Sequence, residues 1–243
     1  MPSKPPRPPR GHLTASNRAE ICVANICLDY SLGDFIEHVS SAREESLSQY
    51  LFWRWRQLDK LFHYQRISPT TPYQEDGIGA DFLLELWLAG PTAILPLLIQ
   101  AKKFVNPGGY ENKLLYRRGT GDQLDKLMAW SHAFDFFPCY LIYVDPKDPA
   151  AAGHTLHLIA ADEIVKLVIG GGLPPTPAMP LLLKDILPKG VPLYNLFCLD
   201  EPHLGAKLPA PLAAFMRDLL SSPLPTGKKI RMSDSFNSPR KCA

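Results

Sequence analysis

Two apolar segments separated by a short turn constrain the fold of this chain more than any other feature. Residues 82–88 read Phe-Leu-Leu-Glu-Leu-Trp-Leu, and residues 93–99 read Ala-Ile-Leu-Pro-Leu-Leu-Ile, with Ala89-Gly90-Pro91 between them. Each segment is long enough for a buried strand and shorter than the roughly 18 residues of a membrane helix. The sequence therefore predicts a buried strand hairpin, in which Pro96 indicates a strand that begins after it or an edge position.

Helical periodicity precedes the hairpin, and further elements follow it. Apolar residues recur at helical spacing over 42–64, after a capping-box pattern at Ser41 and Glu44, and Ser68-Pro-Thr-Thr-Pro72 should end this helix. Periodicity and turn residues also predict a helix over 121–134, strands over 139–144 and 154–160, a helix over 162–169 that begins at Asp162, and a helix over 211–220. This order of elements is typical of an α/β fold.

Composition and charge divide the chain into four parts. It has 243 residues, of which 46% are hydrophobic, and a net charge of +2. The Pro-rich segment 1–18 and the segment 226–243 each carry +4, which leaves −6 for the residues between them. We expect two solvated, disordered basic tails, a core over 19–172 and a Pro-rich extension over 173–225 that packs on it. The alternative for the tails is a salt-sensitive affinity for nucleic acid.

The start of the chain lacks the apolar core of a secretory signal, and no segment is apolar enough to span a membrane. The sequence therefore predicts a cytoplasmic protein. Reduced thiols are expected, because an odd number of scattered cysteines without a C-x-x-C pair argues against a disulfide framework and against structural zinc; they are Cys22, Cys27, Cys139, Cys198 and Cys242.

Two histidines, His154 and His157, lie close together in the sequence and could suggest a metal site. Three positions apart on a strand, their rings should point to opposite faces. No zinc site is expected at this pair.

Polar side chains interrupt the apolar hairpin at one end. Alternation places Asp81 on one face of the first strand, and Gln100 with Lys102 on one face of the second. Such groups are costly to leave unpaired beside apolar strands. A carboxylate, an amide carbonyl and a backbone carbonyl suit Mg²⁺, and Lys102 could orient or deprotonate an attacking water and offset phosphate charge. Glu85 shares the face of Asp81 but lies roughly 13 Å along the strand, so we expect it to be paired elsewhere or exposed.

The pattern Gly-Ala-Asp81, followed after 18 intervening residues by Gln100-Ala-Lys102, resembles the PD-(D/E)XK nuclease superfamily in its Q-x-K form. It is most similar to restriction-endonuclease-like proteins of bacterial defence. The resemblance implies a core of helix, strand hairpin, helix and strand, which is the order read over 42–145. It also implies a metal-binding glutamate on the first helix, for which Glu44 ranks ahead of Glu45.

The chain departs from the fuller motif in two places. Ala80 replaces the proline before the aspartate, and Gln100 replaces the usual acid. Because the second change removes a negative charge, metal binding should depend more on Asp81, the helix glutamate and the substrate phosphate. Gln123, at the start of the following helix, is a candidate for substrate contact. Lys103 is another, although its alternative is an ordinary strand end that faces solvent.

Taken with the resemblance, these residues predict a Mg²⁺-dependent nuclease in which Mn²⁺ can substitute. Asp81, Gln100 and Glu44 would bind the metal, and Lys102 would serve the attacking water. By resemblance, the favoured substrate is DNA rather than RNA, the role is anti-phage or anti-plasmid defence, and a homo-oligomer or an activating partner protein is possible.

Two other hypotheses remain open. One is a nuclease-like fold without catalysis, which binds a partner through its C-terminal hundred residues. The other is an unrelated α/β protein in which Asp81 and Lys102 form a buried ion pair.

Overall fold

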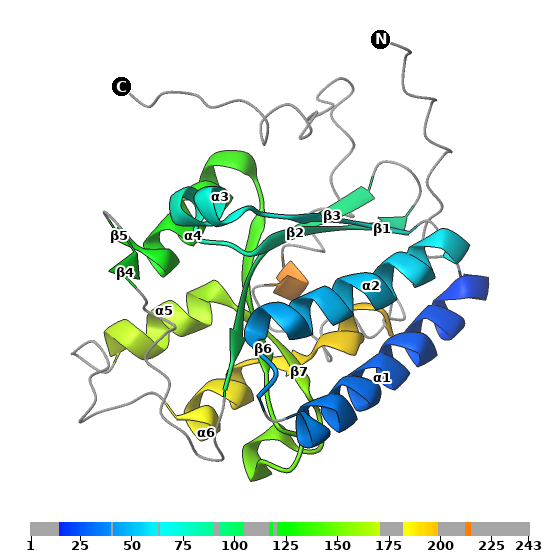
Figure 1. The fold of residues 1–243 in the computed structure, drawn as a ribbon. Helices are drawn as coiled ribbons and strands as arrows, with labels where there is room; N and C mark the ends of the chain where they lie inside the picture. The colour runs from blue at the N-terminus through cyan, green and yellow to red at the C-terminus, as the bar shows by residue number, and fades with distance from the viewer. Residues whose placement is uncertain are drawn as a thin grey trace.

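A computed structural model of the chain describes residues 15–39, 41–62, 64–89, 93–104, 117–118, 121–170, 182–198 and 212–214 (Figure 1). In chain order its helices, 3-10 turns (η) and strands are α1 (Ala15–His38), α2 (Glu44–Phe62), β1 (Gln65–Pro69), α3 (Pro72–Ile78), β2 (Phe82–Ala89), β3 (Ala93–Lys103), β4 (Arg117–Arg118), β5 (Gly121–Asp122), α4 (Gln123–Phe134), β6 (Phe137–Tyr143), η2 (Pro149–Ala151), β7 (Leu156–Ala160), α5 (Ala161–Gly170), α6 (Leu183–Ile186), η3 (Leu187–Lys189), β8 (Val191–Pro192) and η4 (Leu193–Leu196). The α/β fold class predicted from the sequence is confirmed.

A mixed six-stranded sheet forms the centre of the protein, with the strand order β1-β2-β3-β6-β7-β8. Strands β3 and β6 are parallel, and the other neighbours are antiparallel. Parallel neighbours need a crossover connection, and α4 lies within it. The predicted hairpin, helix and following strand are therefore all present, whereas their nuclease-like character remains a prediction.

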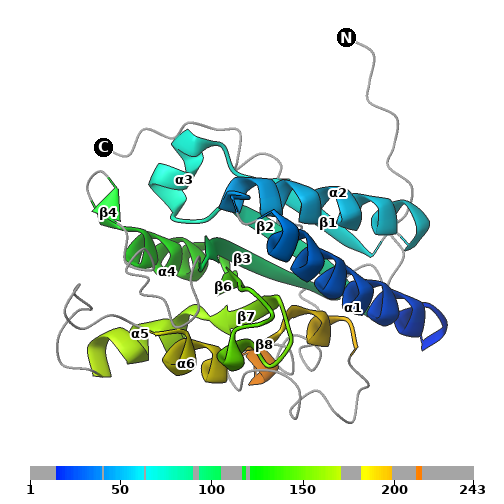
Figure 2. The same ribbon diagram turned by 60° about the horizontal axis from the view of Figure 1, so that its bottom comes forward.

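Helices cover both faces of the sheet (Figures 1 and 2). Alternation along the strands places Leu84 and Ile99 in a core with residues of α1 and α2. It places Leu83 and Leu98 in a second core, to which α4, α5 and α6 contribute. The side chains of Asp81, Gln100 and Lys102 share the parity of this second face.

Helix α2 begins two residues later than predicted. Leu47 donates its N–H to Arg43 O over 3.1 Å, so Glu44 is the first helical residue and Ser41 lies too far upstream for the predicted capping box. The predicted apolar face is confirmed, because Leu47 and Trp55 are fully buried.

Pro96 lies inside β3 rather than before it. It pairs with Glu85 of β2, while the pairing with β6 begins only at Leu97. On the side of β6, no partner strand is described at Pro96. The proline therefore occupies a local edge on the β6 side of a central strand, the kind of position in which a sheet tolerates proline.

Helix α1 was not predicted, and it begins at Ala15, inside the segment expected to be a tail. Its apolar periodicity is broken because polar residues lie on its buried face. Asn25 accepts a hydrogen bond from Trp55 Nε1 over 2.9 Å, and Asp29 accepts one from the Leu156 N–H over 2.7 Å. Only tertiary partners make these buried polar positions compatible with a helix.

The expectation of reduced thiols is wrong for one pair, because Cys22 of α1 forms a disulfide with Cys198. The two residues are separated by 176 positions, and their Cα atoms lie 4.8 Å apart where α1 contacts η4. Sequence spacing carries no signal for such a long-range pair. Cys27 is exposed and Cys139 is buried, both as free thiols.

Part of the predicted Pro-rich extension packs on the core. Leu183, Ile186, Leu193 and Leu196 are buried. Of the predicted helix over 211–220, the structure describes only a helical stretch at 212–214. The rest of that helix lies outside the described residues. So do residues 1–14 and 226–243 of the two basic tails, and the glycines at 171 and 172. Among the described residues, no helix is both long and apolar enough to cross a membrane.

Candidate active site

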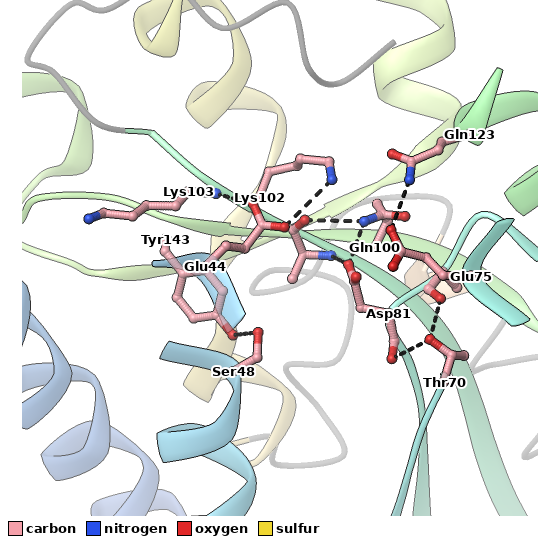
Figure 3. A network of polar contacts seen from close by, with 12 residues as sticks. Glu44, Ser48, Thr70, Glu75, Asp81, Gln100, Lys102, Lys103, Gln123 and Tyr143 are labelled. Carbon is pink, nitrogen blue, oxygen red and sulfur yellow. Dashed lines mark hydrogen bonds and ion pairs between the residues drawn. The ribbon is translucent and has the colours of Figure 1, made fainter. Parts of the chain in front are cut away.

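The polar cluster lies where the hairpin of β2 and β3 meets the start of α2, α3 and α4 (Figure 3). Phe82 pairs with Ile99, so the preceding Asp81 comes opposite Gln100, and Asp81 donates its N–H to Ile99 O over 2.9 Å. Lys102 follows two residues later on the same face. The structure thus brings these three predicted residues together.

Asp81 and Gln100 are in direct contact. Gln100 Nε2 donates to Asp81 Oδ2 through a short hydrogen bond and to Ala101 O over 3.3 Å, and the Ala101 N–H donates to Asp81 Oδ2 over 2.6 Å. Gln100 is fully buried, yet among the described residues its Oε1 has no hydrogen-bond partner. The amide therefore presents its nitrogen, not its carbonyl, to Asp81.

Lys102 forms its ion pair with Glu44 and not with Asp81. Its Nζ lies 3.6 Å from Glu44 Oε1, and only 8% of its side chain is exposed. The hypothesis of a buried Asp81–Lys102 pair is therefore wrong. Glu44 Oε2 also accepts the N–H of Lys103 over 2.8 Å, so this carboxylate holds the start of α2 against the end of β3. The adjacent Glu45 is exposed, and Glu44 is the acid of α2 that reaches the cluster.

Lys103 has a partner away from the face of Lys102. Its Nζ donates to Ala42 O over 2.6 Å, and partial burial lowers the pKa of the ammonium. Lys103 is half-buried, so this strand end is still partly exposed to solvent. The contact with Ala42 ties the segment before α2 to the sheet, and the contact of Lys103 with a substrate remains a prediction.

One turn after Glu44, Ser48 fixes α2 to the sheet. Its Oγ lies 3.0 Å from the hydroxyl of Tyr143 on β6 (Figure 3). Tyr143 is fully buried, and burial raises its pKa above the usual range. This buried pair holds Glu44 at the end of the sheet.

Gln123 and Glu75 form the opposite side of the cluster. Gln123, the first residue of α4, donates from Nε2 to Glu75 Oε1 over 3.0 Å. Gln123 is 3% exposed, and within the described part of the chain its Oε1 also lacks a hydrogen-bond partner. The predicted position of Gln123 beside the site is confirmed, whereas its contact with a substrate remains a prediction.

Glu75 is a site residue that the sequence reasoning missed, because helix α3 was not predicted. The signal was present in the sequence. Thr71 Oγ1 accepts the Gln74 N–H, Gln74 Oε1 accepts the Thr71 N–H, and Gly79 ends the helix in the left-handed conformation with φ 75°. This is a capping box followed by a C-terminal glycine, which a search for helix ends could have found.

The charged groups of the cluster act on the ionisation of Asp81. Burial raises the pKa of Asp81 to about 7; the neighbouring Lys102 lowers it, and Glu44 and Glu75 raise it. Asp81 thus has two carboxylates and one ammonium among its charged neighbours. A divalent cation would relieve the repulsion among the three carboxylates and favour the ionised form of Asp81.

The oxygen atoms of this cluster fit Mg²⁺, which needs few protein ligands. They do not fit a metal ion whose ligands are all acidic side chains. Among the described residues, no three His, Cys, Asp or Glu side chains lie close enough together to hold a metal ion. Mg²⁺ usually takes one or two protein carboxylates, with water and substrate oxygens completing its shell. Asp81 and Glu44 supply carboxylates, and Gln100 Oε1 is a buried oxygen in need of a partner.

Two further predictions concern residues near the cluster or the sheet. Glu85 is paired with Arg66 of β1, so it takes no part in the site, as expected. His154 and His157 do not point to opposite faces, since β7 begins only at Leu156 and their rings lie 6.3 Å apart. Asp29 Oδ2 lies 3.6 Å from His154 Nδ1, and His157 is buried.

The fold and the site define a class of protein: an α/β protein with a mixed six-stranded sheet and a cluster of half-buried carboxylates, buried amides and one buried lysine where strand β2 begins and strand β3 ends. The chain belongs to a family of unknown function, DUF6615, whose model matches residues 29–239. That match covers every residue of the cluster. No curated protein matches the chain.

Proposed function

We propose that this protein is a metal-dependent nuclease that hydrolyses phosphodiester bonds of nucleic acid. The observation that carries the proposal is the convergence of Asp81, Gln100, Lys102 and Glu44 at one end of the sheet. These residues come from the start of α2, the start of β2 and the end of β3, and together they supply oxygen donors and one ammonium. The resemblance in motif to PD-(D/E)XK nucleases points to the same chemistry and favours DNA as the substrate.

The residues divide the work of hydrolysis between them. Asp81, Glu44 and the carbonyl of Gln100 would hold Mg²⁺, which acts as a Lewis acid and lowers the pKa of bound water. Lys102, oriented by Glu44, would position the attacking water and offset negative charge on the phosphate. The water oxygen would lose a proton to solvent and bond to phosphorus as the bond to the leaving ester oxygen breaks, and the leaving oxygen would take up a proton from solvent.

A second candidate is a nuclease-like module that binds a partner without catalysis. One observation favours it: the amide nitrogen of Gln100, rather than its carbonyl, faces Asp81. In that arrangement the Gln100 amide nitrogen already donates a hydrogen bond to the Asp81 carboxylate, so this carboxylate does not need a cation as its partner. Titration calorimetry with Mn²⁺ separates the two candidates, because only the nuclease needs a cation at Asp81.

The direct test is cleavage of supercoiled plasmid, linear duplex DNA, single-stranded DNA and RNA with Mg²⁺ or Mn²⁺. Wild type should cleave at least one substrate, whereas Asp81→Asn and Lys102→Ala should lose activity and remain folded by circular dichroism. Glu45→Gln, which changes an exposed acid beside Glu44, is the matched control and should cleave normally. Equal cleavage by wild type and Asp81→Asn would reject the assignment.

The choice among the four substrates also settles DNA against RNA and duplex against single strand. The proposed role in defence against phage or plasmids rests on the resemblance alone. Protection of cells by wild type and not by Asp81→Asn in a plaque assay would support it.

A further inference from the structure

Helices α1 and α2, which lie side by side, hold three aromatic rings in a row (Figures 1 and 2). The Phe35 ring of α1 stacks on the Tyr50 ring of α2, with centroids 5.7 Å apart and an interplanar angle of 1°. The Tyr50 ring lies 5.9 Å from the Trp53 ring. Trp53 is 52% exposed, whereas Trp55 is fully buried. The row therefore starts between the two helices and ends at an indole that is open to solvent.

Basic side chains accompany the aromatic rings along α2. The guanidinium carbon of Arg54 lies 5.7 Å from the centroid of the Trp53 ring. Arg56 and Lys60 follow Trp53 by three and seven residues, a spacing that places them on one side of the helix, and both are exposed. We call this surface the aromatic-basic stripe, and its members are Tyr50, Trp53, Arg54, Arg56 and Lys60.

The cations of the stripe are not neutralised by the described part of the protein. Neither Arg54 nor Arg56 forms an ion pair with a described residue. Lys60 Nζ donates to the neutral amide of Gln57 over 3.4 Å. Residues 46–58 include no acid. Positive charge is therefore available on this face for a partner that carries negative charge.

The acids of α1 near Phe35 have partners of their own. Glu37 forms an ion pair with Lys147, and Asp34 Oδ1 lies 3.3 Å from His38 Nδ1. These acids are thus already engaged with cationic or titratable groups outside the stripe. They do not supply the partner that the arginines of α2 lack.

We propose that the aromatic-basic stripe binds single-stranded nucleic acid, with an unpaired base stacked on Trp53 and phosphates held by the basic side chains. An exposed ring can stack on an unpaired base, whereas a duplex keeps its bases stacked on one another. The ends of the chain itself are poor occupants of this positive face, because residues 1–18 and 226–243 each carry +4. The inference names the form of nucleic acid that the protein holds, and it rests on the proposed function.

Helix α2 links the stripe to the candidate active site. Glu44 is the first residue of this helix and lies in the cluster with Lys102. Trp53 follows nine residues later, which is roughly 14 Å along the helix axis. A strand of a few nucleotides spans such a distance, so one strand could contact both places.

Fluorescence anisotropy with labelled oligo(dT), oligo(U) and a DNA duplex tests the inference. All proteins carry Asp81→Asn and are measured with EDTA, so that no strand is cut. The parent should bind at least one single strand more tightly than the duplex, and the two strands tell DNA from RNA. Trp53→Leu should weaken this binding about tenfold, because it removes the stacking ring, whereas Trp53→Phe should stay within about threefold of the parent. Leu61→Ala is the matched control, since Leu61 is a 73% exposed apolar residue of the same helix, and it should bind normally.

The salt dependence of binding tests the basic side chains separately. Arg56→Gln should lower the slope of log affinity against log salt by about 0.7, the loss expected for one phosphate contact on a single strand. Lys166→Gln removes a cation of α5 that is 66% exposed and should leave the slope unchanged. Circular dichroism of each variant checks that the fold is retained.

The outcomes separate this inference from the proposed function. If wild type cleaves nucleic acid but Trp53→Leu and Arg56→Gln bind like the parent, the stripe is rejected and the nuclease stands. Equal losses in Trp53→Leu and Trp53→Phe, or tighter binding of the duplex than of either strand, would also overturn the stripe. Absence of both cleavage and binding would reject the proposed function, and the inference with it.

Discussion

Replacing Gly79 by alanine should destabilise the protein by about 2–5 kcal/mol, because this glycine joins the fold to the site. Its φ of 75° costs a non-glycine residue about 1–2 kcal/mol. An added Cβ would lie 2.2 Å from Gln123 O, 2.9 Å from the Leu127 nitrogen and 3.0 Å from Lys126 Cβ. Two of these atoms are backbone and cannot rotate away, so overpacking adds about 1–3 kcal/mol.

The clash also predicts a change at the site. Relief requires the first turn of α4 to move away from α3, which would lengthen the 3.0 Å hydrogen bond between Gln123 and Glu75. Gly79→Ala should therefore lower the unfolding free energy and weaken Mn²⁺ binding together. Urea unfolding followed by circular dichroism measures the first effect, and calorimetry the second.

Gly77 supplies the matched control within the same helix. No atom lies within 4 Å of a Cβ built there, and alanine is favoured over glycine in a helix by up to about 1 kcal/mol. Gly77→Ala should leave stability unchanged or slightly raise it. If Gly79→Ala were as stable as Gly77→Ala, the close approach of α3 and α4 and the reasoning built on it would be refuted.

Three other perturbations have defined outcomes. Glu44→Gln should weaken Mn²⁺ binding about tenfold or more, while Glu45→Gln leaves it unchanged by calorimetry; equal losses would contradict the placement of Glu44. Burial lowers the pKa of His157 to about 4, so the unfolded chain binds its proton more readily and stability is lost as pH falls from 6.5 toward 4. Between pH 7 and 4, wild type should lose about 3 kcal/mol more than His157→Gln in urea unfolding; parallel curves would refute this. Cys22→Ser should lower the free energy of unfolding by about 2–5 kcal/mol relative to wild type with the Cys22–Cys198 disulfide intact, and should not change it relative to wild type with that disulfide reduced. Identical thermal melts of Cys22→Ser and wild type under oxidising conditions would count against the disulfide.

The polar network of α1 shows where local sequence patterns stop being informative. Asn25 and Asp29 interrupt the apolar face that marks a helix, and both are buried against partners far along the chain. Their hydrogen bonds to Trp55 and Leu156 exist only after the helix has packed on the sheet. The same reason explains the missed Cys22–Cys198 bridge, whose partners meet only through tertiary packing.

The site divides in a similar way. Asp81, Gln100 and Lys102 could be placed on one face from strand alternation, since a period of two fixes the face of each residue once the hairpin is known. From the sequence, Glu44 could be ranked above Glu45 as the helix acid of the site but not assigned to it. The capping-box pattern with Ser41 offered another explanation for the carboxylate of Glu44. The structure resolves the ambiguity through the Lys102 and Lys103 contacts of Glu44.

The sequence by itself determined the α/β class, the buried hairpin and the residues that alternation aligns on it. These depend on periodicity and on turn residues, which are properties of neighbouring positions. Only the tertiary structure decided which helix acid joins the site, that Glu75 and Gln123 form its far side, and which way the Gln100 amide faces. Such choices depend on contacts between segments distant in the chain, and their energies arise only when packing removes the polar groups from water.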